Sequence, residues 1–410
     1  MTLAAGCIGR PVSLSPEEAL TRAATRIERI LNEWEKEPSA GTIDLPLDPP
    51  KDPRKISFWY YTHPVIGPAF TARDRLRGFE EEHPDVALEP RFIGDWFHAV
   101  QKLTVSLAAD DLPDVAMVKR GWVGPLIEAG RIFPIDMVLD KRLLDDLRPT
   151  VRAAFSAHGA LFALPADGFC AVLLYNKDVV GDRAPRTWQE LRETARRIAG
   201  DPSRPDFYPI GHIPYLESLW SAGGDVYKDG ACGLTRPEAI EALRFLVSLR
   251  DEGWTHPRAF SDAAAGLELF ASGYVGMTAA SSEYLPQLGR ASFPIGVAPI
   301  PGKTAPVSSV SDNAVVVFSR YAEAKRGALA ALLDYLTGPN VQGAAAVEIG
   351  SAPVRISVAE RAARDNGIED AYACARGTPL IRPWSAIEDE LQFLGWIARP
   401  PSPRISQTSD

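Results

Sequence analysis

The sequence predicts an α/β fold of two lobes. The chain has 410 residues, of which 46% are hydrophobic, and at roughly 150 residues per domain this length accommodates two or three folding units. Short β-rich runs alternate with segments of helical periodicity, first over residues 56–130 and again from residue 161 onwards. Such alternation is typical of sheets that are covered by helices. No internal repeat of roughly 20–50 residues is visible, which excludes solenoids and propellers.

The first alternation begins at a run rich in aromatic residues over 56–61, and residues of this kind favour a strand. The pattern that follows predicts, in order, a helix over 70–82 that ends at His83-Pro84-Asp85, a strand over 86–92, a helix over 96–108, a short buried strand over 115–118 and a helix that ends at Gly130.

The second alternation begins with strands over 161–165 and 172–175. In the helix that Pro237 opens, apolar residues recur at helical spacing from Ile240 to Val247. The whole segment predicts a helix over 187–198, the helix from 237, strands over 276–280, 295–298 and 314–318, and further helices after them.

A separate helix and a linker precede the first alternation. Ser15-Pro16-Glu17-Glu18 forms a capping box with proline at the first helical position, and apolar residues then recur at helical spacing to about Lys36. The stretch over 38–53 is rich in proline and aspartate and reads as an extended linker. The helix could pack on the body or hold it away from an anchor.

Cys7 ends the segment Leu3-Ala4-Ala5-Gly6-Cys7, which resembles the end of a bacterial lipoprotein signal. The resemblance implies a signal remnant over 1–7 and a lipid attached to Cys7, hence a location outside the cytoplasm, in the periplasm or at the cell surface. An accidental match is the alternative, because Ala4 stands where leucine is usual and no apolar segment precedes it.

Composition and motifs exclude several functions. The net charge is −9 and the basic residues are dispersed, so we expect no nucleic-acid partner. No apolar run approaches the roughly 20 residues of a membrane-spanning helix. The other cysteines, Cys170, Cys232 and Cys374, are not spaced for zinc or redox chemistry, and the six histidines are scattered. We expect no metal, no cofactor and no catalytic residue.

The usual catalytic and nucleotide-binding motifs are absent from the sequence, including GxSxG, HExxH and GxGxxG. The nearest match to a phosphate-binding loop runs from Gly296 to Gly302-Lys303-Thr304, but its spacing is one residue too long and it contains two prolines, which donate no amide hydrogen. A pair of carboxylates acting as in a glycosidase stays open, because the many carboxylates cannot be paired from sequence.

Several segments together resemble extracellular solute-binding proteins of family 1, the maltose-binding-protein-like receptors of ABC importers. The resemblance covers about residues 54–390. The segments that carry it are Phe79 to Val86 with its HPD turn, Leu107 to Val115 ending in PDV, Gly130 to Ile135, Gly159 to Pro165, Tyr175-Asn176-Lys177-Asp178, Pro185 to Leu191 with its TWxEL pattern, Phe270 to Met277 and Gly296 to Gly302. Taken singly, most of these motifs are scaffold: Asn176 can end a strand, Trp188 can be buried at a helix start and Gly273 can take a positive φ.

The resemblance implies a periplasmic-binding-protein fold of type II, in which two hinge-linked lobes enclose a ligand cleft. Strands would cross between the lobes near 162–169 and 293–299. The first lobe would hold 54–164 plus 296–322 and the second 168–293 plus 323–396, with 8–53 as helix and linker and 397–410 as a tail. The implied function is that of a monomeric, non-catalytic receptor that captures a mono- or oligosaccharide and delivers it to the permease subunits of an ABC importer.

Candidate ligand contacts follow from the positions of the family's binding loops. Sugars offer apolar faces and hydroxyl rims, so aromatic platforms and polar side chains at strand ends are the expected contacts. In the maltose-binding relatives a stacking tryptophan occupies the place of Trp384. The candidates are Tyr60, Tyr61, His63, Lys119, Arg120, Trp122, Asp167, Phe169, His212, Tyr215, Glu283, Tyr284, Asp312, Asn313 and Trp384.

Three other interpretations stay open. A phosphorylated polyol such as glycerol phosphate could be the ligand, and a buried Lys119 or Arg120 would favour such an anion. A polysaccharide-cleaving enzyme would use two cleft carboxylates about 5–10 Å apart. A receptor that presents its ligand to a membrane sensor would share every residue with the importer subunit.

Overall fold

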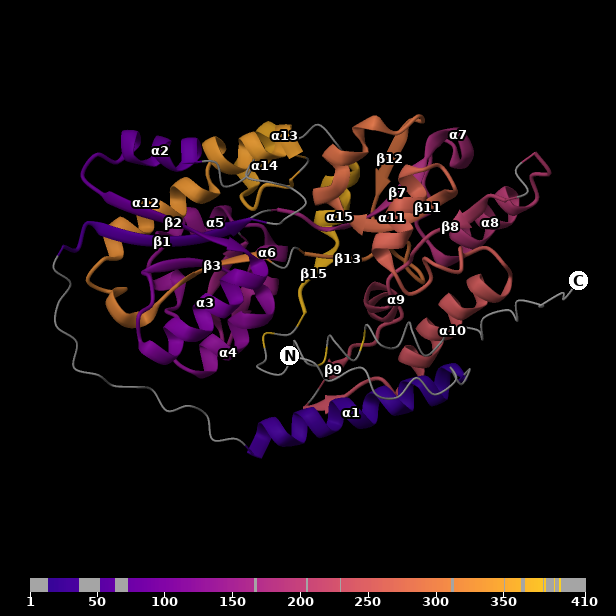
Figure 1. Ribbon diagram of the computed structural model, residues 1–410, viewed down its shortest axis with the longest axis horizontal. Coiled ribbons are helices and arrows are strands. Elements are labelled where there is room, and N and C mark those ends of the chain that lie inside the picture. The colour runs from indigo at the N-terminus through magenta and orange to yellow at the C-terminus, as the bar shows by residue number, and fades with distance from the viewer. Residues whose placement is uncertain are drawn as a thin grey trace, which may run out of the picture.

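The computed structural model has two lobes, each built on one principal sheet (Figure 1). This confirms the two-lobed α/β fold predicted from the sequence. The structure describes residues 14–36, 52–62, 73–165, 168–203, 206–228, 230–310, 313–349, 351–362, 366–378, 380, 387 and 391.

The sheet of the first lobe has five strands. β1 is parallel to the strands on both its sides, whereas the fourth strand runs antiparallel to both its neighbours. The third strand is buried over Val115 to Val118, as expected of a strand with helices on both faces. The spatial order is β2 (Ala87–Asp95), β1 (Lys55–Thr62), β3 (Val115–Lys119), β14 (Asn313–Val317) and β6 (Ala163–Pro165).

Helices from both halves of the chain cover this sheet. The Tyr335 ring packs edge-on against Phe79 with centroids 5.5 Å apart, which joins a late helix to an early one. The elements of this lobe are α2 (Arg73–Glu82), α3 (Trp96–Ala109), η2 (Arg120–Trp122), α4 (Val123–Glu128), η3 (Ile135–Met137), α5 (Lys141–Asp146), α6 (Pro149–Phe155), the hairpin β4 (Ser156–Ala157) and β5 (Ala160–Leu161), η5 (Ser319–Tyr321), α12 (Arg326–Thr337), η6 (Pro339–Gly343), α13 (Ala344–Ile349) and α14 (Ile356–Ala362).

Two ion-pair networks tie the late helices to the first lobe. Lys325, which precedes α12, lies 2.7 Å from the Asp114 carboxylate, and both side chains are about nine-tenths buried. The Asp146 carboxylate accepts hydrogen bonds from Arg355 Nε at 2.9 Å and from the Ser357 amide at 2.9 Å. Burial alone would raise the pKa of Asp146, but the hydrogen bonds from Ser357 and Arg355 outweigh it and hold the pKa below its ordinary value.

The sheet of the second lobe has four strands, in the order β12 (Ile295–Ala298), β7 (Ala171–Asn176), β11 (Val275–Ser281) and β8 (Tyr208–Ile210). β7 runs antiparallel to both neighbours, and β8 is parallel to β11. Successive side chains of β7 enter different cores, Leu173 and Tyr175 on one face and Val172 and Leu174 on the other.

Helices pack on both faces of the second sheet. Trp188 is buried at the start of its helix and stacks on Phe245 with ring centroids 4.1 Å apart. Asn176 ends β7 by accepting a hydrogen bond from the Asp178 amide at 2.9 Å, and Gly273 has φ +76°. The scaffold interpretation of these motif residues is therefore confirmed. The elements are α7 (Lys177–Val180), α8 (Trp188–Ala199), α9 (Tyr215–Ser221), β9 (Tyr227–Lys228), β10 (Ala231–Cys232), α10 (Pro237–Asp251), α11 (Ala263–Ala271), η4 (Ser282–Arg290) and α15 (Asn366–Ala373).

The chain crosses between the lobes between β6 and β7, between β12 and β14, and between α14 and α15. A short parallel pair joins β13 (Ser308–Ser309), on the crossing between β12 and β14, to β15 (Ala375–Arg376), which follows α15. Two predicted boundaries need correction. Residues 295–298 pair with β7 in the second sheet instead of the first. α12 and α14 pack on the first lobe instead of the second, whereas α13 also contacts η4 of the second lobe. Periodicity predicts an element but not the sheet or lobe that it joins.

The predicted N-terminal helix is α1 (Pro16–Lys36), and its capping box forms as the sequence indicates. The Ser15 amide donates to Glu18 at 2.9 Å, and the Glu18 amide donates to Ser15 Oγ at 3.2 Å. α1 contacts α10 and β10 and buries Leu20 and Ile27 completely (Figure 1). The helix therefore packs on the second lobe, which decides between the two roles left open by the sequence.

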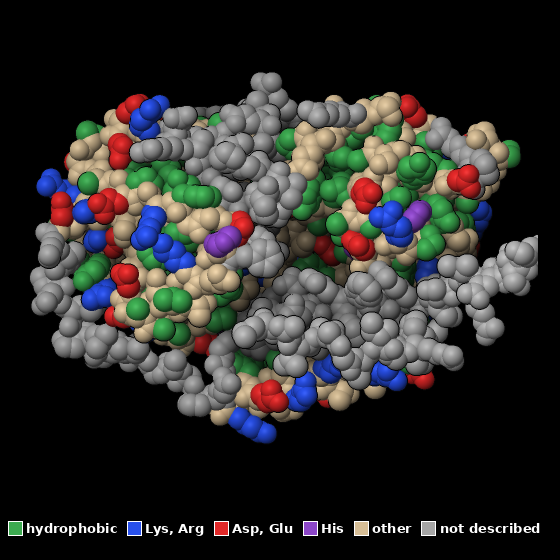
Figure 2. All heavy atoms as spheres, in the orientation of Figure 1, with side chains coloured by type: hydrophobic (Ala, Val, Ile, Leu, Met, Phe, Trp, Pro, Cys, Tyr) green, Lys and Arg blue, Asp and Glu red, His purple; other side chains and the backbone are tan. Residues whose placement is uncertain are grey.

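On the face shown in Figure 2, acidic and basic side chains of the described residues are interspersed. In the described part of the chain no helix is both long and apolar enough to cross a membrane.

Candidate functional site

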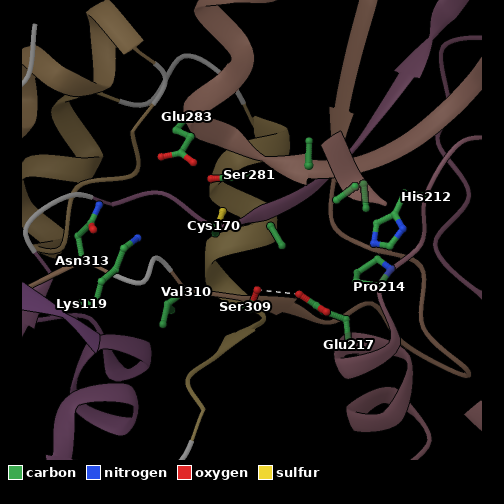
Figure 3. Close-up of a pocket in the computed structure, with 14 residues that line it drawn as sticks. Lys119, Cys170, His212, Pro214, Glu217, Ser281, Glu283, Ser309, Val310 and Asn313 are labelled. Atoms are coloured by element: carbon green, nitrogen blue, oxygen red, sulfur yellow. Dashed lines mark hydrogen bonds between the residues drawn. The ribbon is translucent and has the colours of Figure 1, made fainter. Parts of the chain in front are cut away.

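A cavity of about 260 Å³ lies between the lobes (Figure 3). The ends of strands from both sheets meet there, together with the segments that cross between the lobes. Its lining is formed by Lys119, Cys170, Ala171, His212, Pro214, Glu217, Ala263, Ala279, Ala280, Ser281, Glu283, Ser309, Val310 and Asn313.

Strand direction explains why these residues converge. β3 ends at Lys119, and the antiparallel strand β14 begins beside it, so that Lys119 pairs with Asn313. In the second sheet β11 ends at Ser281 opposite Ala171, where the antiparallel strand β7 begins. The carboxyl ends of some strands and the amino ends of their antiparallel neighbours therefore face the same cavity.

The side chain of Asn313 is held in place by a hydrogen bond from a buried tyrosine. Tyr61, whose side chain is only 3% exposed, donates from its hydroxyl to Asn313 Oδ1 at 2.7 Å. Because the amide oxygen accepts this bond, the orientation of the amide is fixed and its NH₂ group points elsewhere. Tyr61 is thus a positioning residue for Asn313, where the sequence predicted a ligand contact.

Glu217 is a buried carboxylate in the cavity wall. Its side chain is 5% exposed, and one carboxylate oxygen accepts a hydrogen bond from Ser309 Oγ at 2.6 Å. Glu217 lies in the first turn of α9 in the second lobe, and Ser309 lies in β13 on a segment that crosses between the lobes (Figure 3). This bond links one wall of the cavity to the connection between the lobes.

Neutral groups complete the wall. The His212 ring lies with Nδ1 3.1 Å from the Ala259 carbonyl oxygen, which can only accept, so Nδ1 donates. Burial lowers the pKa of His212 despite this bond, and the imidazole is neutral near pH 7. Burial also raises the pKa of Cys170, which keeps that side chain a thiol. The charged groups among the described lining residues are Lys119, Glu217 and Glu283.

Of the residues predicted from sequence, Lys119, His212, Glu283 and Asn313 line the cavity. Their contact with a ligand stays a prediction. His63, Asp167, Asp312 and Trp384, and the lipidation site Cys7, lie outside the described residues.

Other predicted contacts are packed into the protein. Arg120 is 2% exposed and donates to the Ala154 carbonyl and to Thr378, so its guanidinium fixes a chain segment to the first lobe. The Tyr215 hydroxyl donates to the Ala239 carbonyl at 3.2 Å, and burial raises its pKa.

The remaining predicted contacts are aromatic. Tyr60 is buried beside Phe58, with ring centroids 5.8 Å apart, and Phe169 is buried against Ala345. Trp122 packs against the main core, and Tyr284 is half-buried next to Glu283 but is not among the lining residues. Burial and the neighbouring Glu283 charge raise the pKa of Tyr284.

The sequence-based selection missed Glu217, Ser309 and Ser281. Ser281 could have been found as the end of the strand that precedes Glu283. Glu217 gave no such signal, because an acidic residue in the first turn of a helix ordinarily interacts with the helix N-terminus. Among the described residues no group of three metal-binding side chains occurs.

Comparison with known protein families gives one match over most of the chain. Residues 75–371 match the family described as bacterial extracellular solute-binding protein.

Curated relatives include a putative binding protein of Brucella abortus, 26% identical over 60% of this chain and 63% of that protein. A maltotriose-binding protein of Pyrococcus abyssi is 26% identical over 62% of this chain and 57% of that protein. A mannitol-binding protein of Pseudomonas aeruginosa is 34% identical over 31% and 30%. The chain thus spans about 63% of the length of the first of these relatives, and all three are named as binding proteins.

Solved structures share the two-lobed fold. The sugar-binding protein MalE of Xanthomonas citri superposes with a TM-score of 0.71 at 21% identity, covering 84% of this chain and 92% of that one. A tagatose-bound solute-binding protein of Thermotoga lettingae gives 0.66 at 22%, with 84% and 94% covered. A glycerophosphocholine complex of UgpB from Mycobacterium tuberculosis gives 0.67 at 21%, with the same coverage. At these identities the likeness confirms the predicted fold.

Proposed function

Because the chain belongs to the family of bacterial extracellular solute-binding proteins, we propose that it captures a small carbohydrate or polyol between its lobes and delivers it to the permease of an ABC importer. The observation that carries the proposal is the inter-lobe cavity, whose polar side chains come from both lobes. A ligand that contacts Lys119 and Asn313 on one side and Glu217 on the other joins the lobes, and a permease can recognise that joined state.

The chemistry of the wall suits hydroxyl groups. Each sugar hydroxyl both donates and accepts hydrogen bonds, and the cavity offers carboxylate acceptors, an ammonium donor and serine hydroxyls that can do either. Hydrogen bonds to charged groups are the stronger ones, so Glu217, Glu283 and Lys119 should contribute most of the polar affinity. The relatives named for maltotriose and mannitol support this class of ligand.

A phosphorylated polyol is the second candidate, supported by the likeness to the glycerophosphocholine-bound structure. The sequence indicated that a buried Arg120 would favour an anionic ligand, and Arg120 is buried. Its guanidinium, however, donates to the Ala154 carbonyl and to Thr378 and does not line the cavity. Glu217 and Glu283 do line it, and like charges in one site repel a phosphate. These contacts favour a neutral ligand.

We also propose that the protein is not an enzyme and works outside the cytoplasm as a monomer, consistent with the family and with relatives named as binding proteins. The polysaccharide-cleaving alternative would assign general acid and base roles to Glu217 and Glu283. Lipid attachment at Cys7 stays a prediction.

Titration calorimetry tests the proposal. Glucose, mannitol, maltose, maltotriose and glycerol 3-phosphate are titrated separately, and the recovered oligosaccharides are analysed for cleavage. We expect saturable binding of at least one neutral carbohydrate or polyol and no cleavage. Binding of glycerol 3-phosphate alone would support the second candidate, whereas cleavage or failure of every compound to bind would contradict the proposal.

A further inference from the structure

The cavity between the lobes is small, and its apolar surface is made by short side chains. Its volume of about 260 Å³ lies below the roughly 300–1,000 Å³ typical of pockets for drug-sized ligands. The ends of β7 and β11 contribute Ala171, Ala279 and Ala280, and α11 contributes Ala263 at the rim. Ala171 and Ala279 lie on one face of the sheet and Ala280 on the other, so the apolar floor is the small-residue end of the sheet itself, which suits the CH groups of one ring or of a short carbon chain.

Polar groups approach this floor from several sides. In Figure 3 Lys119 and Asn313 lie on one side, Glu217 and Ser309 on another, and Ser281 and Glu283 on a third. A ligand small enough for the cavity reaches all three sides only if it carries hydroxyl groups around its whole periphery.

We infer that the ligand is a neutral monosaccharide or short acyclic polyol, and that oligosaccharides are excluded. This inference narrows the proposed function and rests on it. The volume of the cavity suits one sugar unit, and the two carboxylates disfavour an anionic substituent.

The calorimetric series separates this inference from the proposed function. We expect glucose or mannitol to bind at least 100-fold more tightly than maltotriose and glycerol 3-phosphate. If maltotriose binds as tightly as either, the size inference is wrong while the proposed function stands. If no compound binds, the proposed function itself fails.

A matched pair of variants tests whether this cavity is the site. Ala263 and Ala264 are adjacent and exposed at the start of α11, but only Ala263 is among the residues that line the cavity. Ala263→Leu should weaken binding of the preferred compound at least tenfold, and Ala264→Leu should bind like the wild type, with equal melting temperatures for both. Equal affinities for the two variants would place the ligand elsewhere.

A second inference comes from the N-terminal helix, because α1 packs on the second lobe and also touches the first. Near its end the Trp34 indole Nε1 donates to Glu128 Oε2 at 3.0 Å. Glu128 ends α4, which follows the cavity residue Lys119 through η2. The helix itself is anchored on the second lobe by the fully buried Leu20 and Ile27.

A hinge motion between the lobes changes the distance from Trp34 to Glu128, so the bond stabilises only the arrangement in which it forms. We propose that α1 braces the two lobes in the arrangement that creates the cavity. Removal of the bond should then weaken ligand binding even though neither residue lines the cavity.

Trp34→Phe keeps an aromatic ring and removes the donor. The bond is only part-buried, so water competes for both groups, and its removal corresponds to an expected loss of about 2- to 12-fold in affinity. Glu128→Gln should act in the same direction, and the double variant should lose no more than the larger single effect. Asn32→Ala, on the exposed side of the same helix, is the control.

Small-angle scattering of the ligand-free protein gives an independent readout. The radius of gyration of Trp34→Phe should exceed that of the wild type and of Asn32→Ala. Wild-type affinity and scattering for Trp34→Phe, at an unchanged melting temperature, would overturn the brace. So would additive effects in the double variant.

Discussion

Replacing Glu217 by glutamine probes the strongest polar contact that the cavity offers. The substitution keeps the shape of the side chain and an acceptor oxygen for Ser309 Oγ, which lies 2.6 Å from the carboxylate; it removes the negative charge and replaces the other acceptor oxygen by an NH₂ donor. Because Glu217 is 5% exposed, the hydroxyl groups of a bound ligand meet this carboxylate with little competition from water.

Hydrogen bonds to a charged group contribute about 1.5–3 kcal/mol. At 1.4 kcal/mol per factor of ten, Glu217→Gln should weaken binding about 10- to 150-fold. The melting temperature should stay the same or rise, because a buried charge is removed while its hydrogen bond is retained.

Calorimetry of the preferred ligand with wild type, Glu217→Gln and a control measures this effect. Glu241 on α10 is a suitable control, since its carboxylate pairs with Lys303 at 2.8 Å on a half-exposed surface outside the cavity. Glu241→Gln should leave the affinity unchanged. An affinity of Glu217→Gln within about twofold of the wild type would refute the assignment of Glu217 as a ligand contact.

Three further predictions concern stability and pH. Lys325→Met removes one partner of the buried pair with Asp114 and should lower the free energy of unfolding by about 3–5 kcal/mol in urea titrations; a loss below about 1 kcal/mol would mean that the pair is no more than a surface ion pair. The hydrogen bonds from Ser357 and Arg355 lower the pKa of Asp146, so the ionised carboxylate stabilises the fold at pH values above its ordinary pKa. This stabilisation is lost as the pH falls through the folded-state pKa. Asp146→Asn should therefore lose less stability than the wild type between about pH 5 and pH 3, and equal losses would contradict the linkage. Because burial lowers the pKa of His212 below its ordinary value of about 6.5, the ring is neutral between about pH 7 and 8, and affinity measured across this range should be constant; a transition within it would show that the ring titrates there.

The sequence predicted the elements well because local signals determined them. The capping box of α1 and the alternation of strands and helices depend on neighbouring residues, and the strand over 295–298 was predicted with the bounds of β12. Its sheet was not predicted, since a strand between two lobes pairs with whichever partner the tertiary structure brings to it, here β7. The same holds for α12, whose place on the first lobe depends on contacts such as that between Tyr335 and Phe79.

The site was predicted in part, for a related reason. Loops after strands were the natural place to search, and Lys119 and Glu283 were found there. Asn313 was found from its place before a strand. No local pattern showed that β14 and β7 run antiparallel to β3 and β11, which brings their amino ends to the edge where β3 and β11 end. Tyr60 and Arg120 illustrate the opposite error, because a polar or aromatic residue at a strand end can equally turn into the protein and be buried.

A crystal structure of the protein with its preferred ligand tests the central claim most directly. We predict one ligand molecule between the lobes, within hydrogen-bond distance of Lys119 or Asn313 on the first lobe and of Glu217 or Glu283 on the second. A ligand that contacts only one lobe, or that occupies the separate groove between α5 and α12 lined by Leu143 and Ala331, would contradict the account.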